Sequence, residues 1–325
     1  GRIHAQHPDQ VFTYLQKVMA MESTASTSRW RKNILHLSGG STASERTLFK
    51  TYTQTFAAQI QQTSLAPSIT TLSKTNDDPI EQIPIHKYLN EGLALITMFG
   101  HSGLESTDLN IGYASDSSHI SPHTPYFPAV IVNGCATGSI FYSNSTISSD
   151  WIFAPKSGAV LFLAHTFNGA SSYLQRYTAS IYDVLADPDF QSKPFGLIQQ
   201  EAIRRNLSNH FSIGDAIHAQ QMNLQGDPAI RIFPATMPDY RFDTTYFKQI
   251  QPVSAHADSI SFEIVIQNNG RAYDDTLSLL LSRRIRGELL QIHTFQCTKI
   301  TYADTLIFRI PRQNPLYEPE SWELK

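Results

Sequence analysis

Two side chains of the kind that perform covalent catalysis, an imidazole and a thiol, each follow a short apolar run and lie in a glycine-containing turn. The imidazole of His101 lies in the turn 100–103 (Gly-His-Ser-Gly), and the thiol of Cys135 lies in the turn 133–138 (Asn-Gly-Cys-Ala-Thr-Gly). A short, β-branched apolar run next to glycine is typical of a buried strand in a parallel sheet. Catalytic groups gather at the carboxyl ends of such strands. We therefore expect both side chains at one edge of a sheet.

A thiol and an imidazole placed in this way support nucleophilic attack on a carbonyl carbon. The thiolate is the reactive form, and a nearby base or positive charge keeps part of it ionised near neutral pH. Cys135 is then the nucleophile, while His101 protonates the leaving amine and later activates water. The oxyanion that forms needs preorganised donors, which we expect from the backbone N–H groups of Cys135 and of Ser102 or Gly103.

A lone cysteine is most often a small, inert apolar side chain, so the position of Cys135 carries the argument. It follows the end of its predicted strand and stands between Gly134 and Gly138. Glycine adopts backbone conformations that other residues resist, and we expect Gly134 and Gly138 to use this freedom in the thiol turn, while Gly100 supports the imidazole turn. Cys135 and Cys297 are the two cysteines of the chain, which excludes a disulfide framework.

The turn that carries the imidazole also offers a serine. Residues 100–104 (Gly-His-Ser-Gly-Leu) are similar to the nucleophile elbow Gly-x-Ser-x-Gly of α/β-hydrolases, in which Ser102 would be the nucleophile. Leu104 stands where that motif requires glycine, and the residues after it predict a loop rather than a helix. The serine hydrolase is therefore the less favoured alternative.

Other titratable side chains nearby favour structural roles. His119 and His123 are four residues apart, as two metal ligands on a helix would be, but Pro122 and a further proline predict a loop. We expect two surface histidines and no metal site. Asp108 and Asp116 have the chemistry for a specificity pocket or a cation, although solvated loop acids are the commoner reading.

Composition limits the classes of function. The chain has 325 residues, of which 41% are hydrophobic, and this length favours two domains over one. A formal net charge of -3 and the lack of a Lys/Arg block give no indication of nucleic-acid binding. No apolar stretch approaches the roughly 20 residues that span a bilayer. The opening residues 1–4 lack the features of a signal peptide, and we expect the chain to start inside a domain.

The elements that must position the two turns alternate along the first 233 residues. This alternation predicts an open, mainly parallel sheet with helices on both faces, a Rossmann-like α/β fold. The predicted strands are 33–37, 68–73, 93–99, 128–132, 158–164 and 229–233, and the predicted helices are 8–22, 43–62, 80–90, 170–186 and 194–208.

The pattern changes near residue 237. After it, apolar and polar residues alternate in four segments between turn signals, which predicts a small β-sandwich. These segments are 259–267, 276–282, 289–294 and 305–310. They contain no cluster of histidine, cysteine and acidic residues, so we expect a supporting module. The predicted domains are therefore 1–237 and 238–325.

The ordered motifs of the first domain resemble the gingipain-like cysteine peptidases, peptidase family C25 of the caspase-like clan. The resemblance implies a caspase-like sheet, an endopeptidase dyad of His101 and Cys135, and an immunoglobulin-like domain after the catalytic one. The family usually has a further αβ half before its Gly-Arg-Ile segment, so we expect this chain to lack that half. The motifs are Gly1-Arg2-Ile3, Gly100-His101, residues 133–138, residues 150–160 and Gly226-Asp227-Pro228.

The resemblance also implies where such a protein acts. Family members belong to Bacteroidetes and reach the cell surface or the medium through the type IX secretion system, so we expect an extracellular or outer-membrane surface location and protein or peptide substrates. The forms of residues 99–102 and 132–135 are nearer to the PorU-like subset, sortases that cleave and attach the cargo of that system. Secretion components would then be partners. No cofactor is required, and a structural calcium ion is compatible with the family.

Two positions depart from the family pattern. In gingipains an acidic residue near the first strand end orients the histidine, and the matching position here is Ser38, whose hydroxyl carries no charge. Glu45 is a substitute, although its place on a predicted helix is expected to point it elsewhere. Ser102 stands where the family often has glycine, and this difference weakens the assignment of the second oxyanion donor. The alternative function is therefore a catalytically inert scaffold or binding component of a surface secretion complex. No counterpart of the acid that selects Arg or Lys is evident.

Overall fold

A computed structural model describes residues 1–142, 145–242, 247–250, 259–274, 276–298, 300–311 and 320–324. The chain divides into two compact units, residues 1–236 and 237–325. Among the described helices, none is both long enough and apolar enough to cross a bilayer.

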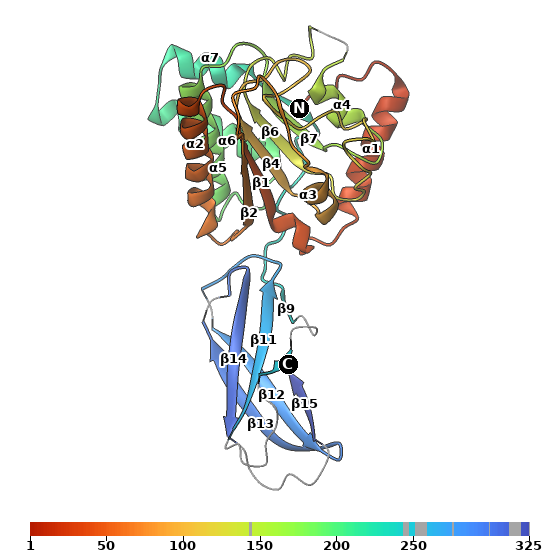
Figure 1. The fold of residues 1–325 in the computed structure, drawn as a ribbon, viewed down its shortest axis with the longest axis vertical. Helices are drawn as coiled ribbons and strands as arrows, with labels where there is room; N and C mark the ends of the chain where they lie inside the picture. Colours follow the sequence, from red (N-terminus) through yellow and green to blue (C-terminus); the bar gives the residue numbers. More distant parts are fainter. Residues whose placement is uncertain are drawn as a thin grey trace. The chain divides into compact units, whose positions relative to one another are not determined.

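The first unit is built around a six-stranded sheet of order β2-β1-β4-β6-β7-β8 (Figure 1). Neighbouring strands are parallel except for β8, which runs antiparallel to β7. The central strands are buried almost throughout, and this explains their continuous apolar runs. The predicted mainly parallel sheet is confirmed. The strands are β1 (Asn33–Ser38), β2 (Ser68–Ser73), β4 (Leu95–Phe99), β6 (Ala129–Asn133), β7 (Leu161–His165) and β8 (Met222–Gly226).

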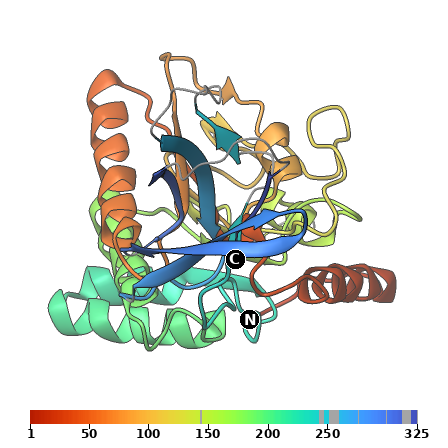
Figure 2. The ribbon, with the colours of Figure 1, turned by 90° about the horizontal axis from the view of Figure 1, so that it is seen from below.

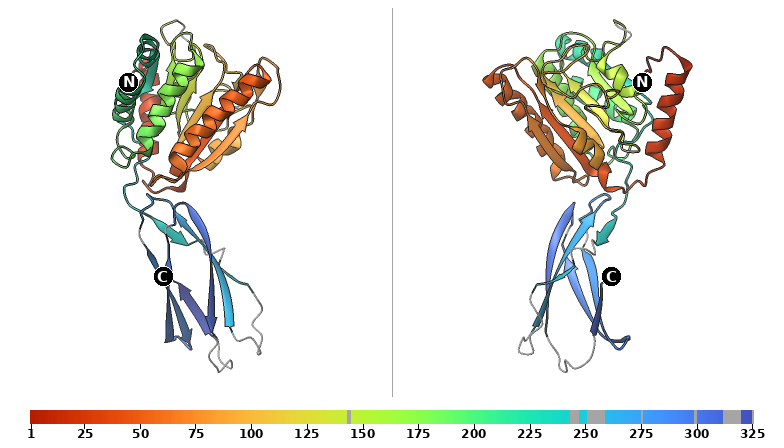
Figure 3. Two further views of the ribbon diagram at one scale, coloured as in Figure 1. Left: turned by 90° about the vertical axis from the view of Figure 1, so that its left-hand side faces the viewer. Right: turned by 45° about the vertical axis from the view of Figure 1, so that its right-hand side comes forward.

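Helices cover both faces of this sheet, as the alternation predicts. On one side lie α2 (Ala43–Gln61), α5 (Ser171–Ala186), α6 (Phe195–Asn209) and α7 (Ile213–Gln221), and on the other lie α1 (Pro8–Glu22), α3 (His86–Glu91) and α4 (Ile147–Phe153) (Figures 1 and 3). Seen from below, α1 and α2 flank the sheet from opposite sides (Figure 2). The core between these layers is rich in large buried side chains, including Phe56, Phe99, Trp151, Phe162 and Tyr182.

Some predicted elements of the first unit are wrong. The predicted helix 80–90 is instead a short strand, β3 (Glu81–Gln82), paired with β5 (Leu109–Asn110) and followed by α3. The last strand is β8 rather than 229–233. Its polar residues hide it from an apolar pattern, and Asn223 for example donates from Nδ2 to Gly138 O at 3.2 Å.

The second unit consists of antiparallel strands in two sheets. One contains β9 (Tyr240–Phe242), β10 (Lys248–Gln249), β11 (Ser259–Asn268) and β14 (Ala303–Pro311), and the other contains β12 (Leu277–Ile285), β13 (Glu288–Cys297) and β15 (Glu320–Leu324). Side chains of both sheets share a core in which β11 contributes Ile264 and Ile266 and β12 contributes Leu279. Cys297 is buried in this core, so the two cysteines lie in different units.

Candidate active site

The turns that carry the imidazole and the thiol lie side by side at the carboxyl edge of the sheet. They follow β4 and β6, neighbouring parallel strands that pair through their last residues. The Gly100 N–H donates to Asn133 O at 3.1 Å. The Ser102 hydroxyl donates to Cys135 O at 2.9 Å. The structure therefore brings the two predicted turns into direct contact.

Close packing, rather than backbone freedom, requires glycine in the thiol turn. A Cβ on Gly134 would lie 2.1 Å from Ser102 Oγ, and one on Gly138 would lie 2.2 Å from Ala164 O. Neither glycine has a positive φ, which corrects the expectation based on conformational freedom. The left-handed residue of the turn is Ala136, whose φ is 56°.

The imidazole of His101 is held by α2. Glu45 Oε2 lies 3.2 Å from His101 Nε2, and the Phe49 ring meets the imidazole edge-on at 5.9 Å between centroids. The expectation that Glu45 points elsewhere is wrong, because its carboxylate folds back over the start of the helix. Thr42 caps α2 by accepting the Glu45 N–H, and Glu45 Oε2 in turn accepts the Ser41 N–H at 2.9 Å. The sequence Thr-x-x-Glu of a capping box is the signal that would have indicated this direction.

Glu45 is the charged partner of this pair. Its partial burial raises its pKa, but the hydrogen bond with His101 and those with the N–H groups of Ser41 and Thr42 outweigh burial and hold the pKa below its ordinary value. The side chains of His101 and Glu45 are 48% and 35% exposed, so the pair is open to solvent. An ionised carboxylate here orients the imidazole.

Ser38 contacts a neighbouring strand rather than the imidazole. Its buried hydroxyl donates to Ser73 Oγ at 2.8 Å, across β1 and β2. The prediction that Ser38 is a supporting site residue is therefore not matched by a contact with His101. The acid that contacts the imidazole comes from α2 rather than from the end of β1.

Asp108 is a buried carboxylate behind the imidazole turn. It is 4% exposed, so the reading as a solvated loop acid is wrong. Its two oxygens accept the N–H groups of Gly40 at 2.7 Å and Leu109 at 2.9 Å, and its own N–H donates to His101 O at 2.9 Å. A Cβ on Gly100 would lie 2.4 Å from this carboxylate. Asp108 therefore ties together the loops that follow β1 and β4.

Two backbone N–H groups near the thiol are available to an oxyanion. Within the described part of the chain, those of Ser102 and Cys135 donate no hydrogen bond. The Gly103 N–H donates to Ser106 O at 2.9 Å, which favours Ser102 over Gly103 as the second donor. The Ser102 hydroxyl accepts from Thr137 Oγ1 at 2.7 Å and donates to Cys135 O. These bonds link the two turns, and they give no support to Ser102 as a nucleophile.

The half-buried thiol of Cys135 faces the segment that follows β7. The Gly169 N–H donates to Cys135 Sγ at 3.4 Å. Beside it, the Ala136 N–H donates to Phe167 O at 2.9 Å. The thiol turn therefore lies against this segment, and Gly169 is a contact that sequence reasoning missed.

Asn133, the last residue of β6, holds the start of the thiol turn through its side chain. Its buried side chain donates from Nδ2 to Met98 O at 3.1 Å and accepts at Oδ1 from the Thr178 hydroxyl at 2.5 Å. These bonds join the ends of β4 and β6 to α5.

The two histidines at metal-ligand spacing lie in different environments. His123 is buried, with its ring nitrogens each 3.1 Å from a backbone oxygen, of Ser121 and Gly158, and burial lowers its pKa. The reading of His123 as a surface residue is therefore wrong. His119 is exposed, and its Nε2 lies 3.9 Å from Asp116 Oδ2. No group of three potential metal ligands occurs among the residues that the structure describes.

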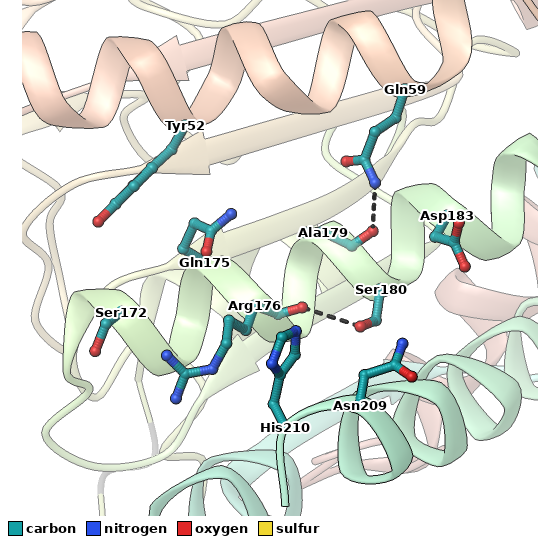
Figure 4. Close-up of a pocket in the computed structure, with 10 residues that line it drawn as sticks. All are labelled: Tyr52, Gln59, Ser172, Gln175, Arg176, Ala179, Ser180, Asp183, Asn209 and His210. Carbon is teal, nitrogen blue, oxygen red and sulfur yellow. Dashed lines mark hydrogen bonds between the residues drawn. The ribbon is translucent and has the colours of Figure 1, made fainter.

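A groove of about 450 Å³ lies along α2, α5 and the end of α6 (Figure 4). Gln59 and Ser180 bond to backbone oxygens of α5, while Arg176 and Asp183 pair with residues outside the groove. None of its lining residues belongs to either turn, and we assign it no part in the chemistry. The lining residues are Tyr52, Gln59, Ser172, Gln175, Arg176, Ala179, Ser180, Asp183, Asn209 and His210.

Comparisons with known proteins agree with this arrangement. The family model described as Peptidase family C25 matches residues 1–233. Among solved structures, the chain is similar to the Arg-specific cysteine proteinase gingipain R, with a TM-score of 0.58 and 16% identity over 91% of this chain and 66% of that one. It is also similar to the complex of the Porphyromonas gingivalis RgpB pro- and mature domains, with a TM-score of 0.56 and 14% identity over 92% of this chain and 70% of that one.

A third similar structure, described as a protease, has a TM-score of 0.54 and 12% identity over 99% of this chain and 73% of that one. No curated protein sequence matches the chain. At these identities the structures show a shared fold. This chain spans about two thirds of the gingipain R chain that it matches.

Proposed function

The chain belongs to peptidase family C25, and from that premise we propose that it is a cysteine endopeptidase with Cys135 as nucleophile and His101 as general acid and base. The observation that carries the proposal is the pairing of His101 with the Glu45 carboxylate, 3.2 Å apart, on the turn that contacts the Cys135 turn. An orienting carboxylate, an imidazole and a thiol are the parts that thiol peptidases need.

In the proposed reaction, Cys135 Sγ bonds to the scissile carbonyl carbon, and the carbonyl electrons move onto oxygen. The N–H groups of Ser102 and Cys135 stabilise that oxyanion. His101 then protonates the leaving amine as the C–N bond breaks, which leaves a thioester on Cys135. His101 next removes a proton from water, which attacks the thioester and releases a carboxylic acid and the free thiol.

Glu45 supports these proton transfers. With Nε2 facing Glu45, the other ring nitrogen of His101 is the one that exchanges protons with the thiol and the leaving group. The carboxylate lowers the free energy of the imidazolium that forms when His101 takes up the thiol proton. Because Cys135, His101 and a charged partner are all present, the alternative of an inert scaffold is not favoured.

The test is alkylation of Cys135 by iodoacetamide, followed by mass spectrometry. We expect labelling faster than that of a free peptide thiol, and we expect His101→Ala to abolish the difference. Labelling of the wild-type protein at the rate of a free thiol would contradict the proposal. A fluorophosphonate that modifies Ser102, together with peptidase activity retained in Cys135→Ala, would support the serine alternative instead.

We further propose that the substrates are proteins or peptides at the extracellular or outer-membrane surface. Similarity to the gingipain fold supports this location. The sequences of residues 99–102 and 132–135 support a PorU-like sortase role, and with it partners in type IX secretion. A sortase differs from a peptidase in that an amine, rather than water, attacks the thioester. Adding a glycine-rich acceptor peptide to a cleavage reaction tests the difference, because a sortase gives a ligated product and a peptidase gives only the acid.

The second unit is proposed to be an immunoglobulin-like supporting domain. Its two antiparallel sheets with a shared core support this reading.

A further inference from the structure

His218, on α7, lies next to the segment that contacts the thiol, and its hydrogen bonds assign its tautomer. Its Nδ1 lies 2.7 Å from Gly214 O, which can only accept, so Nδ1 donates. Its Nε2 lies 2.9 Å from Ala170 N, which can only donate, so Nε2 accepts. Only the neutral imidazole with its proton on Nδ1 satisfies both partners.

The residue that His218 binds, Ala170, is adjacent in sequence to the residue that contacts the sulfur. Gly169 directly precedes Ala170, and its N–H donates to Cys135 Sγ at 3.4 Å. Ala170 is the N-cap residue of α5 and has no side chain that could accept a hydrogen bond there. His218 therefore secures the start of α5 from a neighbouring helix.

Little space surrounds the segment that carries this donor. A Cβ on Gly169 would lie 2.6 Å from Leu174 Cδ1 and 3.2 Å from Gly134 O. Gly169 therefore fits closely between the thiol turn and the first turn of α5. A hydrogen bond to an ionised acceptor is stronger than one to a neutral acceptor, and the N-terminus of a helix also favours a negative sulfur.

The titratable groups around this link are few. The His218 ring stacks on His165 at 5.1 Å and contacts the Tyr173 ring at 4.6 Å. Burial lowers the pKa of His165, so this neighbour is uncharged near neutral pH. On α7 itself, Asp215 is paired with Arg176 at 2.8 Å. On the sulfur side, the facing pair is His101 with Glu45, described above.

We propose that His218 is a positioning residue for the nucleophile: it holds the Gly169 N–H against Cys135 Sγ and thereby stabilises the thiolate. This inference rests on the proposed function of Cys135. Loss of the acceptor at Nε2 would release the segment and reduce the thiolate fraction. The reactivity of Cys135 would then depend on a histidine outside the dyad.

Two substitutions separate the acceptor role of His218 from its packing. In His218→Gln, the side-chain oxygen reaches the position of Nε2 and can still accept the Ala170 N–H. In His218→Asn, the shorter amide can replace only the bond to Gly214 O. The measurement is the rate of Cys135 alkylation by iodoacetamide between pH 4 and pH 10, followed by mass spectrometry of the Cys135 peptide. Because His218 lies in the first unit, far-UV circular dichroism of the same samples reports loss of folding of that unit.

The readout is the midpoint of the rate against pH, which follows the thiolate fraction. We expect His218→Asn to shift the midpoint upward by about one pH unit, which is about tenfold less thiolate below the midpoint, and we expect His218→Gln to stay near the wild type. An unshifted midpoint in His218→Asn, or an equal shift in both variants, would overturn the inference while leaving the proposed function intact. Wild-type Cys135 that reacts as a free peptide thiol would instead contradict the proposed function.

Discussion

At the scale of single residues, the Glu45 carboxylate is the group on which the chemistry of His101 depends. Glu45→Gln keeps the size of the side chain and can keep a hydrogen bond to Nε2, but it removes the charge that stabilises imidazolium. We expect kcat/KM to fall by roughly 10- to 100-fold, with most of the loss in kcat; this is less than the roughly 10²- to 10⁴-fold contribution of a general acid–base group itself, because Gln can still orient the imidazole. Steady-state hydrolysis of a fluorogenic peptide measures this. A higher KM with an unchanged kcat would indicate that Glu45 binds substrate instead.

The same carboxylate gives a prediction about pH. The pKa of Glu45 in the folded protein lies below its unfolded value, so its stabilising pair with His101 is fully present above the unfolded pKa. It is lost as the pH falls through the folded pKa. We expect the stability difference between the wild type and Glu45→Gln to be constant between about pH 5 and pH 6 and to shrink toward pH 3. Urea unfolding at a series of pH values measures it, and a difference that grows with acid would contradict the assignment.

Asp108 is expected to matter for stability rather than for proton transfer. Asp108→Asn keeps one acceptor oxygen, but its NH₂ group then faces a backbone N–H that the carboxylate satisfied, either that of Gly40 or that of Leu109. A buried donor without an acceptor costs about 1–3 kcal/mol. We expect Tm to fall by several degrees in thermal unfolding followed by circular dichroism. Asp116→Asn, at an exposed carboxylate, is the matched control and should leave Tm unchanged.

At the scale of elements, a buried polar contact joins the sheet to α5. His36 Nε2, on β1, lies 2.7 Å from the Tyr182 hydroxyl, which lies 2.7 Å from Thr97 Oγ1 on β4. Burial lowers the pKa of His36 to about 4, below the unfolded value near 6.5. The folded protein therefore favours the neutral form of the His36 ring over the charged form.

This arrangement predicts acid sensitivity of the packing between sheet and helix. Above the unfolded pKa, the titration of His36 does not change the free energy of unfolding. As the pH falls from about 6.5 to about 4, His36 lowers that free energy by about 3 kcal/mol. His36→Leu should remove that part of the slope, and Tyr182 keeps its partner Thr97. Unfolding free energies of both proteins between pH 4 and pH 7 measure the difference. Parallel curves would show that His36 titrates normally in the folded protein.

The elements that the sequence predicted well are those with uninterrupted apolar runs. Residues 93–99 and 128–132 indicated β4 and β6 because parallel strands covered on both faces must be apolar throughout. The edge strand β8 and the short helix α7 escaped because polar side chains such as Asn223 are satisfied by contacts from distant segments. The contact of His218 escaped for a related reason, since it depends on how α7 packs against α5 rather than on local pattern. The direction of Glu45, by contrast, had a local signal in the Thr-x-x-Glu sequence at the start of α2.

At the scale of the whole molecule, each unit has a hydrophobic core of its own. Residues of the first unit form one large cluster, whereas Ile264, Leu279 and Phe308 belong to a cluster made only of second-unit residues. A unit with its own core can unfold as one cooperative body. The two cysteines report on these bodies separately, because Cys135 lies in the first unit and Cys297 in the second.

We therefore expect two transitions on heating, and each should have its own cysteine reporter. In calorimetry, Asp108→Asn should lower the temperature of one transition and leave the other in place, because Asp108 lies in the first unit. Alkylation during a temperature ramp identifies the transitions: exposure of Cys297, which is 7% exposed in the folded protein, should follow the transition that Asp108→Asn does not move. If Asp108→Asn shifted the exposure of Cys297 as much as the first transition, the two cores would unfold as one cooperative body.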